Sequence, residues 1–246
     1  TDCAARAPGA ACRGRSGRAA PRAGPRRRRP RARAGRPPAR SARLAGAMGE
    51  RPTRRDALVW VDCEMTGLGA EGGPGGDSLL EVACLLTDGE LNLIAEGPDL
   101  VLHQPDEVLA GMNEWCQRQF GWRGAGEVVP GGLADQVRRS EVSLQEADCA
   151  LLDLVSRHLE KGVGVLAGNT VHMDKRFLDK FCPRFMGHLH YRLVDVSTVK
   201  ELCRRWHPED FARAPAKTGR HRALDDIRES LEELRHYRSA IFKASG

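Results

Sequence analysis

The sequence predicts an α/β fold in which a mixed β-sheet is flanked by helices. Between residues 57 and 104, three apolar runs follow one another with short connections, which is typical of an antiparallel meander. Beyond residue 143, short apolar runs alternate with stretches of helical periodicity, which is typical of βα units. In such a layer, functional sites lie at the carboxyl ends of the strands.

The first fifty residues differ in composition from the rest of the chain. Residues 1–50 contain fourteen Arg, no Lys and two acids, a net charge of +12, so residues 51–246 carry −6 of the chain's total of +6. Residues 1–50 have almost no apolar periodicity, so we expect a disordered Arg-rich leader there. Residues 51–246 then form one domain.

An Arg-rich, acid-poor leader is typical of an organelle-targeting peptide. A basic arm that binds nucleic acid and translated upstream sequence without a role are the alternatives. Met48 offers a second start that would give a product without the leader. No apolar run is long enough to span a membrane, and the eight Cys include no C-x-x-C pair, which argues against a zinc site and for a reducing compartment.

The strands of the meander are expected at residues 57–62, Leu79–Thr87 and Leu91–Gln104, the last interrupted at Gly97–Pro98. A Gly-rich loop at 69–77 joins the first two. Glu81 stands in the second run, where an exposed position is more frequent for an acid than a buried one near a metal.

The middle of the chain is predicted to be helical. Pro105–Phe120 has a proline at its start, and Ser143 and Glu146 form a capping box that opens a helix to about Leu159. Between these helices, residues 121–132 form a second Gly-rich loop. Trp115 is most simply a core residue, and base stacking is the alternative.

Two βα units and a final helix complete the domain. We expect strands at Gly164–Asn169 and Tyr191–Ser197, helices ending near Phe181 and spanning Ser197–Trp206, and a loop at 207–220. A last helix runs to about Tyr237, with His221 at its entry.

Asp62 and Glu64 end the first strand one residue apart, so their side chains point to the same face. Two such charges repel unless a cation lies between them, which indicates a divalent metal; acids facing water on an edge strand are the alternative. Asp174 near a helix start serves either as a ligand or as a cap. His221, close to Asp226, is a candidate for catalysis.

These acids and the histidine resemble the D-x-E, D and H-x4-D motifs of the DEDDh 3′→5′ exonucleases. Longer segments resemble the oligoribonuclease family, including its animal mitochondrial members: Trp60–Asp62, Glu64–Leu68, Leu166–Asn169, His190–Arg192, Asp195–Leu202 and His221–Ile227. The resemblance covers residues 57–242. It implies a ribonuclease-H-like fold and hydrolysis of short oligoribonucleotides, especially dinucleotides, to 5′-mononucleotides by a homodimer, located in mitochondria, with cytoplasmic or nuclear forms from Met48.

The resemblance also implies the roles of single residues. Asp62, Glu64, Asp174 and Asp226 would hold two Mg²⁺ or Mn²⁺ ions, with His221 as the general base. Asp225 would point away, since one residue turns a helix by about 100°. The remaining implied contacts are with substrate: Leu68 and Trp115 with the bases, Thr170, Arg192, Ser197 and Thr198 with the terminal phosphate, and Tyr191 from a second subunit.

Cys63 stands where the family usually has Leu, and we expect it to point away from the two acids. Thr170 replaces the usual Ser and keeps the hydroxyl, and the two Gly-rich loops are longer than usual. A non-catalytic RNA-binding domain of this fold would have lost an acid or the histidine. A proofreading or transfer-RNA-trimming exonuclease would lack the segments at 190–192 and 195–198 and be more basic. Because residues 51–246 carry a net negative charge, we expect the domain to bind only a few phosphates of a nucleic acid.

Overall fold

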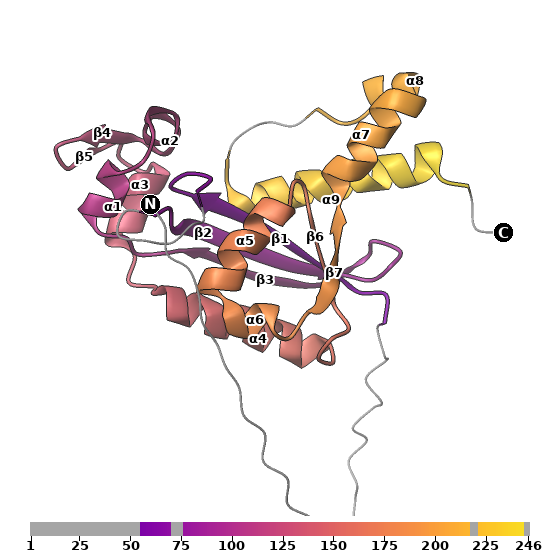
Figure 1. Ribbon diagram of the computed structural model, residues 1–246, viewed down its shortest axis with the longest axis horizontal. Coiled ribbons are helices and arrows are strands. Elements are labelled where there is room, and N and C mark those ends of the chain that lie inside the picture. Colours follow the sequence, from indigo (N-terminus) through magenta and orange to yellow (C-terminus); the bar gives the residue numbers. More distant parts are fainter. Residues whose placement is uncertain (1–54, 70–75, 217–220, 244–246) are drawn as a thin grey trace, which may run out of the picture. The chain divides into compact units, whose positions relative to one another are not determined.

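A five-stranded mixed sheet forms the centre of the domain, with β1 as its middle strand in the order β3-β2-β1-β6-β7 (Figure 1). The computed structural model describes residues 55–69, 76–216 and 221–243. The strands span Leu58–Met65 (β1), Leu79–Thr87 (β2), Leu93–Val101 (β3), Val165–Gly168 (β6) and His190–Asp195 (β7). The predicted leader, most of the first Gly-rich loop and part of the loop at 207–220 lie outside these ranges.

The predicted meander is confirmed, with two corrections. β1, β2 and β3 pair antiparallel in sequence order, but β1 continues past residue 62 and includes Glu64. β3 runs through Gly97 and Pro98 without a break, and an irregular register on β2 absorbs them. A Cβ at Gly97 would lie 2.6 Å from the carbonyl oxygen of Cys84, so glycine permits the close approach of the two strands here.

The two faces of the sheet are covered by different helices (Figure 1). Val59, Val61 and Cys63 belong to the core cluster with α4 (Leu144–His158), α5 (His172–Phe181) and α6 (Pro183–Met186). Trp60 belongs to the opposite cluster, with α7 (Val196–Trp206) and α9 (Ala223–Ile241). Because side chains alternate along a strand, Asp62 and Glu64 lie on the α9 face.

α9 is the longest helix that the structure describes and supplies much of the second core. Ile227, Leu231, Leu234 and Tyr237 are buried at helical spacing, as the sequence predicts, but the helix continues four residues beyond Tyr237. The predicted capping box of α4 is also confirmed: the Ser143 hydroxyl accepts the Glu146 N–H, and the Glu146 carboxylate accepts the Ser143 N–H.

The segment between β3 and α4 differs from the prediction. Pro105–Phe120 is two helices, α1 (Asp106–Ala110) and α2 (Glu114–Phe120), because the Asn113 side chain caps the Cys116 N–H and starts a new helix. The expected loop at 121–132 holds a small ribbon of β4 (Trp122–Gly124) and β5 (Glu127–Val128). Three further helices were not predicted: α3 (Leu133–Arg139), α6 and α8 (Pro208–Ala212). Within the described ranges, no helix has the length and apolarity to cross a membrane.

Candidate active site

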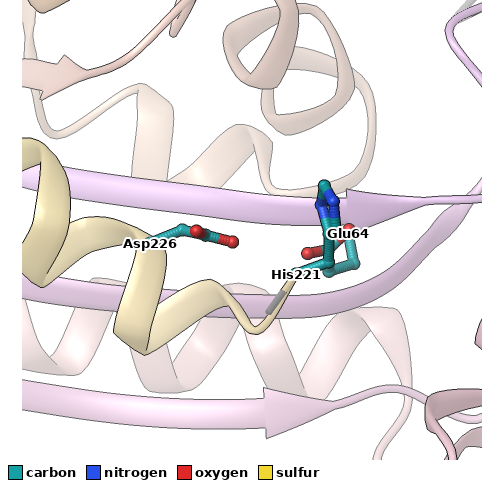
Figure 2. Close-up of side chains that lie close together, drawn as sticks. All are labelled: Glu64, His221 and Asp226. Atoms are coloured by element: carbon teal, nitrogen blue, oxygen red, sulfur yellow. The ribbon is translucent and has the colours of Figure 1, made fainter. Parts of the chain in front are cut away.

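The candidate site lies where the parallel strands β1, β6 and β7 end. β6 pairs with β1 only from Leu58 to Trp60, so the carboxyl half of β1 extends beyond its neighbour. Asp62 and Glu64 stand on this extension. The amino end of α9 reaches the same place and brings His221 and Asp226 (Figure 2).

Three side chains form a compact group there. One ligand atom from each of Glu64, His221 and Asp226 lies within 4.8 Å of the other two. Figure 2 shows the Asp226 carboxylate directed from α9 toward Glu64 and His221. Asp225 lies outside this group and contacts Arg228, 3.6 Å away, as expected for the neighbouring position on a helix.

The electrostatics of Glu64 suit a cation. Glu64 is 7% exposed. Burial raises its pKa to about 8, and the negative charges of Asp226, Glu81 and Asp174 add to the effect, while the charge of Arg222 opposes it. Hard carboxylate oxygens held together against their mutual repulsion are the donor set that Mg²⁺ and Mn²⁺ prefer, so these residues fit a divalent ion.

Asp174 reaches the site from the other face of the sheet. It lies in the first turn of α5, is 5% exposed, and its Oδ1 accepts the main-chain N–H of Cys63 at 3.0 Å. Burial raises the pKa of Asp174 to about 7, although the hydrogen bonds from its own N–H and from Cys63 lower it. A role limited to capping its own helix is therefore wrong, because Asp174 is tied to β1.

Asp62 and Cys63 complete the strand. Asp62 is half-buried on the face of Glu64, and neither Asp62 nor Asp174 belongs to the compact group. Cys63 points away from Asp62 and Glu64, as predicted, but its thiol bonds to the Asp174 carboxylate. Burial raises the pKa of this thiol, and the charges of Asp174 and Asp62 raise it further.

His221 packs its ring against an aromatic side chain. Its backbone lies in the left-handed region, with φ 51°. Its ring meets the ring of Trp115 edge-on, with 5.4 Å between centroids. Trp115 is 52% exposed, so the simple interpretation of Trp115 as a core residue is wrong.

A cavity of about 410 Å³ opens beside these residues. It is mostly apolar, and its lining is Cys63, Glu64, Met65, Gly67, Leu68, Asn113, Trp115, Cys116 and Phe120. The structure therefore brings Leu68 and Trp115 together next to Glu64. A larger cavity of about 600 Å³, at the opposite end of β1 beside Leu58 and Phe242, holds none of the predicted site residues.

Thr170 and Ser197 also meet. Their hydroxyl oxygens are 2.9 Å apart, and the Thr170 N–H donates to the Ser197 hydroxyl and to Asp195, each at 2.9 Å. Thr170 has a φ of 54°, which this hydrogen bonding holds in place. Thr198 follows in the first turn of α7.

The exonuclease family model matches residues 59–234 of the chain. The mitochondrial oligoribonucleases of Mus musculus and Homo sapiens are 52% and 51% identical over 81% of this chain and 78% of their own length. The oligoribonuclease of Marinobacter nauticus is 46% identical over 76% of the chain and 97% of its own length. This chain belongs to the oligoribonuclease family. The enzyme class expected from the sequence, a 3′→5′ exoribonuclease, is that of the family.

Solved structures confirm the ribonuclease-H-like exonuclease fold expected for an oligoribonuclease-family chain. Exonuclease I from E. coli, in complex with an oligonucleotide, has a TM-score of 0.55 at 15% identity and covers 76% of this chain. Exonuclease I from Methylocaldum szegediense has a TM-score of 0.53 at 19% identity and covers 75%. This chain spans about 41% of either structure. At such identities the likeness shows the fold alone.

Two residues that the family resemblance assigns to the substrate lie apart from the rest. Tyr191 and Arg192 stand on β7, an edge strand, and the Arg192 guanidinium lies 5.6 Å from the centre of the Tyr191 ring. Arg192 lines a separate cavity of about 320 Å³ with Arg55 and His190. Among the residues that the structure describes, no contact given for Arg192 involves Thr170 or Ser197.

Sequence reasoning gave no role at the site to Glu81, Arg222 or Asp77. Glu81 is fully buried and ion-paired with Arg222, so its expected exposure is wrong. Its place opposite Glu64 on β2 was the available signal. Asp77 accepts the Thr66 hydroxyl at 3.0 Å and the Gly69 N–H at 2.6 Å, which holds the turn that carries Leu68.

Proposed function

We propose that this chain is a 3′→5′ exoribonuclease that degrades short oligoribonucleotides, dinucleotides above all, to nucleoside 5′-monophosphates. The observation that carries the proposal is the juxtaposition of Glu64, His221 and Asp226, with Glu64 also lining the cavity that Leu68 and Trp115 line. Membership of the oligoribonuclease family supports the same activity.

Asp62, Glu64, Asp174 and Asp226 are the proposed ligands of two divalent ions, Mg²⁺ or Mn²⁺. When bound, such ions neutralise the charge that develops on the phosphate. The raised pKa of Glu64 and the hydrogen bond from Cys63 to Asp174 support this donor set, because each carboxylate is held where charge repulsion must be offset. In this proposal the four carboxylates supply the oxygen donors for the ions at the end of β1.

His221 is the proposed general base, which takes the proton of the attacking water. The ring of Trp115 limits where the imidazole can lie. Exposed Leu68 and Trp115 offer an apolar slot for the terminal bases, and stacking of this kind tolerates any base.

Selection of short substrates follows from charge and from a phosphate cap. Residues 51–246 are acidic, so affinity comes from few contacts and not from a long basic track. The paired hydroxyls of Thr170 and Ser197, with Thr198, are the proposed cap for the terminal phosphate at the start of α7.

A homodimer completes the proposed site. Tyr191 is 78% exposed on the edge strand, and Leu193, Leu202 and Trp206 expose further apolar surface on β7 and α7. We assign this surface to the contact between subunits, so that Tyr191 reaches the partner's substrate, while Arg192 stays a proposed contact of the terminal phosphate in its own subunit. The exposure of Tyr191 at the edge of the sheet supports this proposal.

The leader, residues 1–50, is the proposed mitochondrial address, with a leaderless form from Met48 in the cytoplasm or nucleus. Its charge and the mitochondrial names of the animal relatives support this. Residues 1–50 fused to a fluorescent protein should enter mitochondria. A diffuse or nuclear signal would favour a basic arm or a segment without a role.

The activity is tested with labelled RNAs from two to twenty nucleotides long. We expect the fastest turnover on dinucleotides, 5′-mononucleotide products, loss of activity with chelator, and recovery with Mg²⁺ or Mn²⁺. Equal rates at all lengths would overturn the proposed selectivity, and activity in the presence of chelator would overturn the metal site.

A further inference from the structure

A buried acid faces the candidate metal ligand Glu64 from the neighbouring strand. Glu81 on β2 is directly opposite Glu64 on β1, so the two side chains share the α9 face of the sheet. Glu81 is fully buried. A buried carboxylate needs a charged and hydrogen-bonded partner.

Arg222 is that partner. Its Nε lies 3.0 and 3.1 Å from the two oxygens of Glu81, and its Nη2 lies 2.9 Å from Oε1. Such a two-pronged contact sets the orientation of the guanidinium as well as its position. The pair joins β2 to the N-cap residue of α9, 141 positions along the chain.

Arg222 stands between the two catalytic groups of this segment. It is the N-cap of α9 and makes no side-chain capping bond, and its carbonyl accepts the Asp226 N–H at 3.0 Å. His221 comes immediately before it, in a left-handed conformation that is unfavourable for a residue other than glycine. Such a conformation persists only where the surroundings hold it.

Contacts other than this pair also hold α9 on the sheet. Ile227, Leu231 and Tyr237 bury its apolar face, and Arg228 binds Glu96 of β3 with both oxygens at 3.0 Å. The Glu81–Arg222 pair therefore holds the residues that precede the first turn of α9. The contacts of Ile227, Leu231, Tyr237 and Arg228 do not fix the position of His221.

We propose that Arg222, anchored by Glu81, is the positioning residue for His221. The inference rests on the proposed function, in which His221 takes a proton from water. The ion pair sets the backbone of residue 222 against the sheet, and so places the imidazole between Glu64 and the edge of Trp115.

The test compares Arg222→Lys and Glu81→Gln with the control Arg228→Lys, which alters an Arg–Glu pair of the same helix away from the site. Lysine keeps the charge and loses the two-pronged geometry. We expect the first two variants to lower kcat on a dinucleotide roughly 10- to 100-fold with little change in KM, and the control to stay within about twofold of wild type. In a His221→Ala background, Arg222→Lys should have almost no further effect, because its action passes through His221.

A second measurement does not depend on activity. In the NMR spectrum of histidine-labelled protein, the His221 ring signal, identified by its loss in His221→Ala, should show the ring-current shift from Trp115. We expect that shift to be lost in Arg222→Lys and kept in Arg228→Lys. Kinetic effects of Arg222→Lys and His221→Ala that multiply, or an unchanged His221 signal, would overturn the inference. An inactive wild-type enzyme would refute the proposed function instead, and the NMR signal would still decide the position of His221.

Discussion

The main-chain N–H of Cys63 donates a hydrogen bond to Asp174 Oδ1 across 3.0 Å, so a carboxylate of α5 occupies the edge of β1. Cys63 thereby contributes to the site through its backbone, although its side chain belongs to the opposite core. This explains how the residue between Asp62 and Glu64 can differ from the Leu that the family resemblance leads one to expect.

Cys63→Ala should therefore keep most of the catalytic activity. The backbone donor remains, and the lost thiol contact and packing cost about 1–2 kcal/mol of stability. Asp174→Asn, which keeps the shape and loses the charge, should lose activity by orders of magnitude. Turnover of a dinucleotide and thermal melting of both variants check this, and a comparable loss of turnover in Cys63→Ala would show that the thiol itself is needed.

Asp226→Ala should abolish turnover, whereas Asp225→Ala should retain it within a few-fold. Asp226 lies in the compact group with Glu64, while Asp225 contacts exposed Arg228, a pair worth about 0–1 kcal/mol. The measurement is kcat at saturating Mg²⁺. Equal losses in the two variants would contradict the assignment.

His221→Ala should lower kcat about 100- to 10,000-fold, the usual contribution of a general base, while Mn²⁺ binding is largely kept. Because a ring nitrogen of His221 lies within 4.8 Å of the ligand oxygens, calorimetry must distinguish base from ligand. A collapse of Mn²⁺ affinity in the variant would make His221 a ligand.

The metal-free protein should lose stability as the pH rises. Burial raises the pKa of Glu64 in the folded state from the ordinary 4.5 to about 8, so between these values the folded state holds a proton that the unfolded chain releases. That stability is present below pH 4.5 and is lost as the pH approaches 8. Each 1 kcal/mol lost lowers Tm by about 2–4 °C for a domain of this size.

Melting of the chelated protein across this pH range tests the point. Mg²⁺ or Mn²⁺ should restore Tm at the upper end, because bound cations favour the ionised carboxylates. Glu64→Gln should flatten the dependence. A Tm that climbs with pH in the chelated protein would contradict it.

Tyr191 should act across the subunit contact, and co-expression of two inactive variants tests this. A dimer of Asp226→Ala with Tyr191→Ala holds one site that combines an intact Asp226 with Tyr191 of the partner subunit. Random pairing should recover about a quarter of wild-type activity. If Tyr191 serves its own subunit, the mixture stays inactive; a monomer in solution with full activity would exclude the model.

The sequence predicted the five strands of the main sheet and α4, α5, α7 and α9, because these elements carry long apolar patterns or a capping box. It did not predict the division at Asn113, the β4–β5 ribbon or the short helices α3, α6 and α8, which depend on packing and caps more than on periodicity. The same distinction between local patterns and distant contacts holds for the candidate site. Motifs located Glu64, His221 and Asp226, but the contact between Glu81 and Arg222 joins distant positions that no local pattern connects.

The shortness of β6 has a consequence for the chemistry. A continuous sheet is a partition that keeps the side chains of its two faces apart. Where β6 leaves β1 after Trp60, that partition has a notch, and Asp174 from one side meets the neighbourhood of Glu64 and Asp226 from the other. Two more residues of pairing would fill the notch with backbone and displace the carboxylate. We therefore expect the length of β6 to limit activity. Insertions that lengthen β6 should abolish turnover while the domain stays folded.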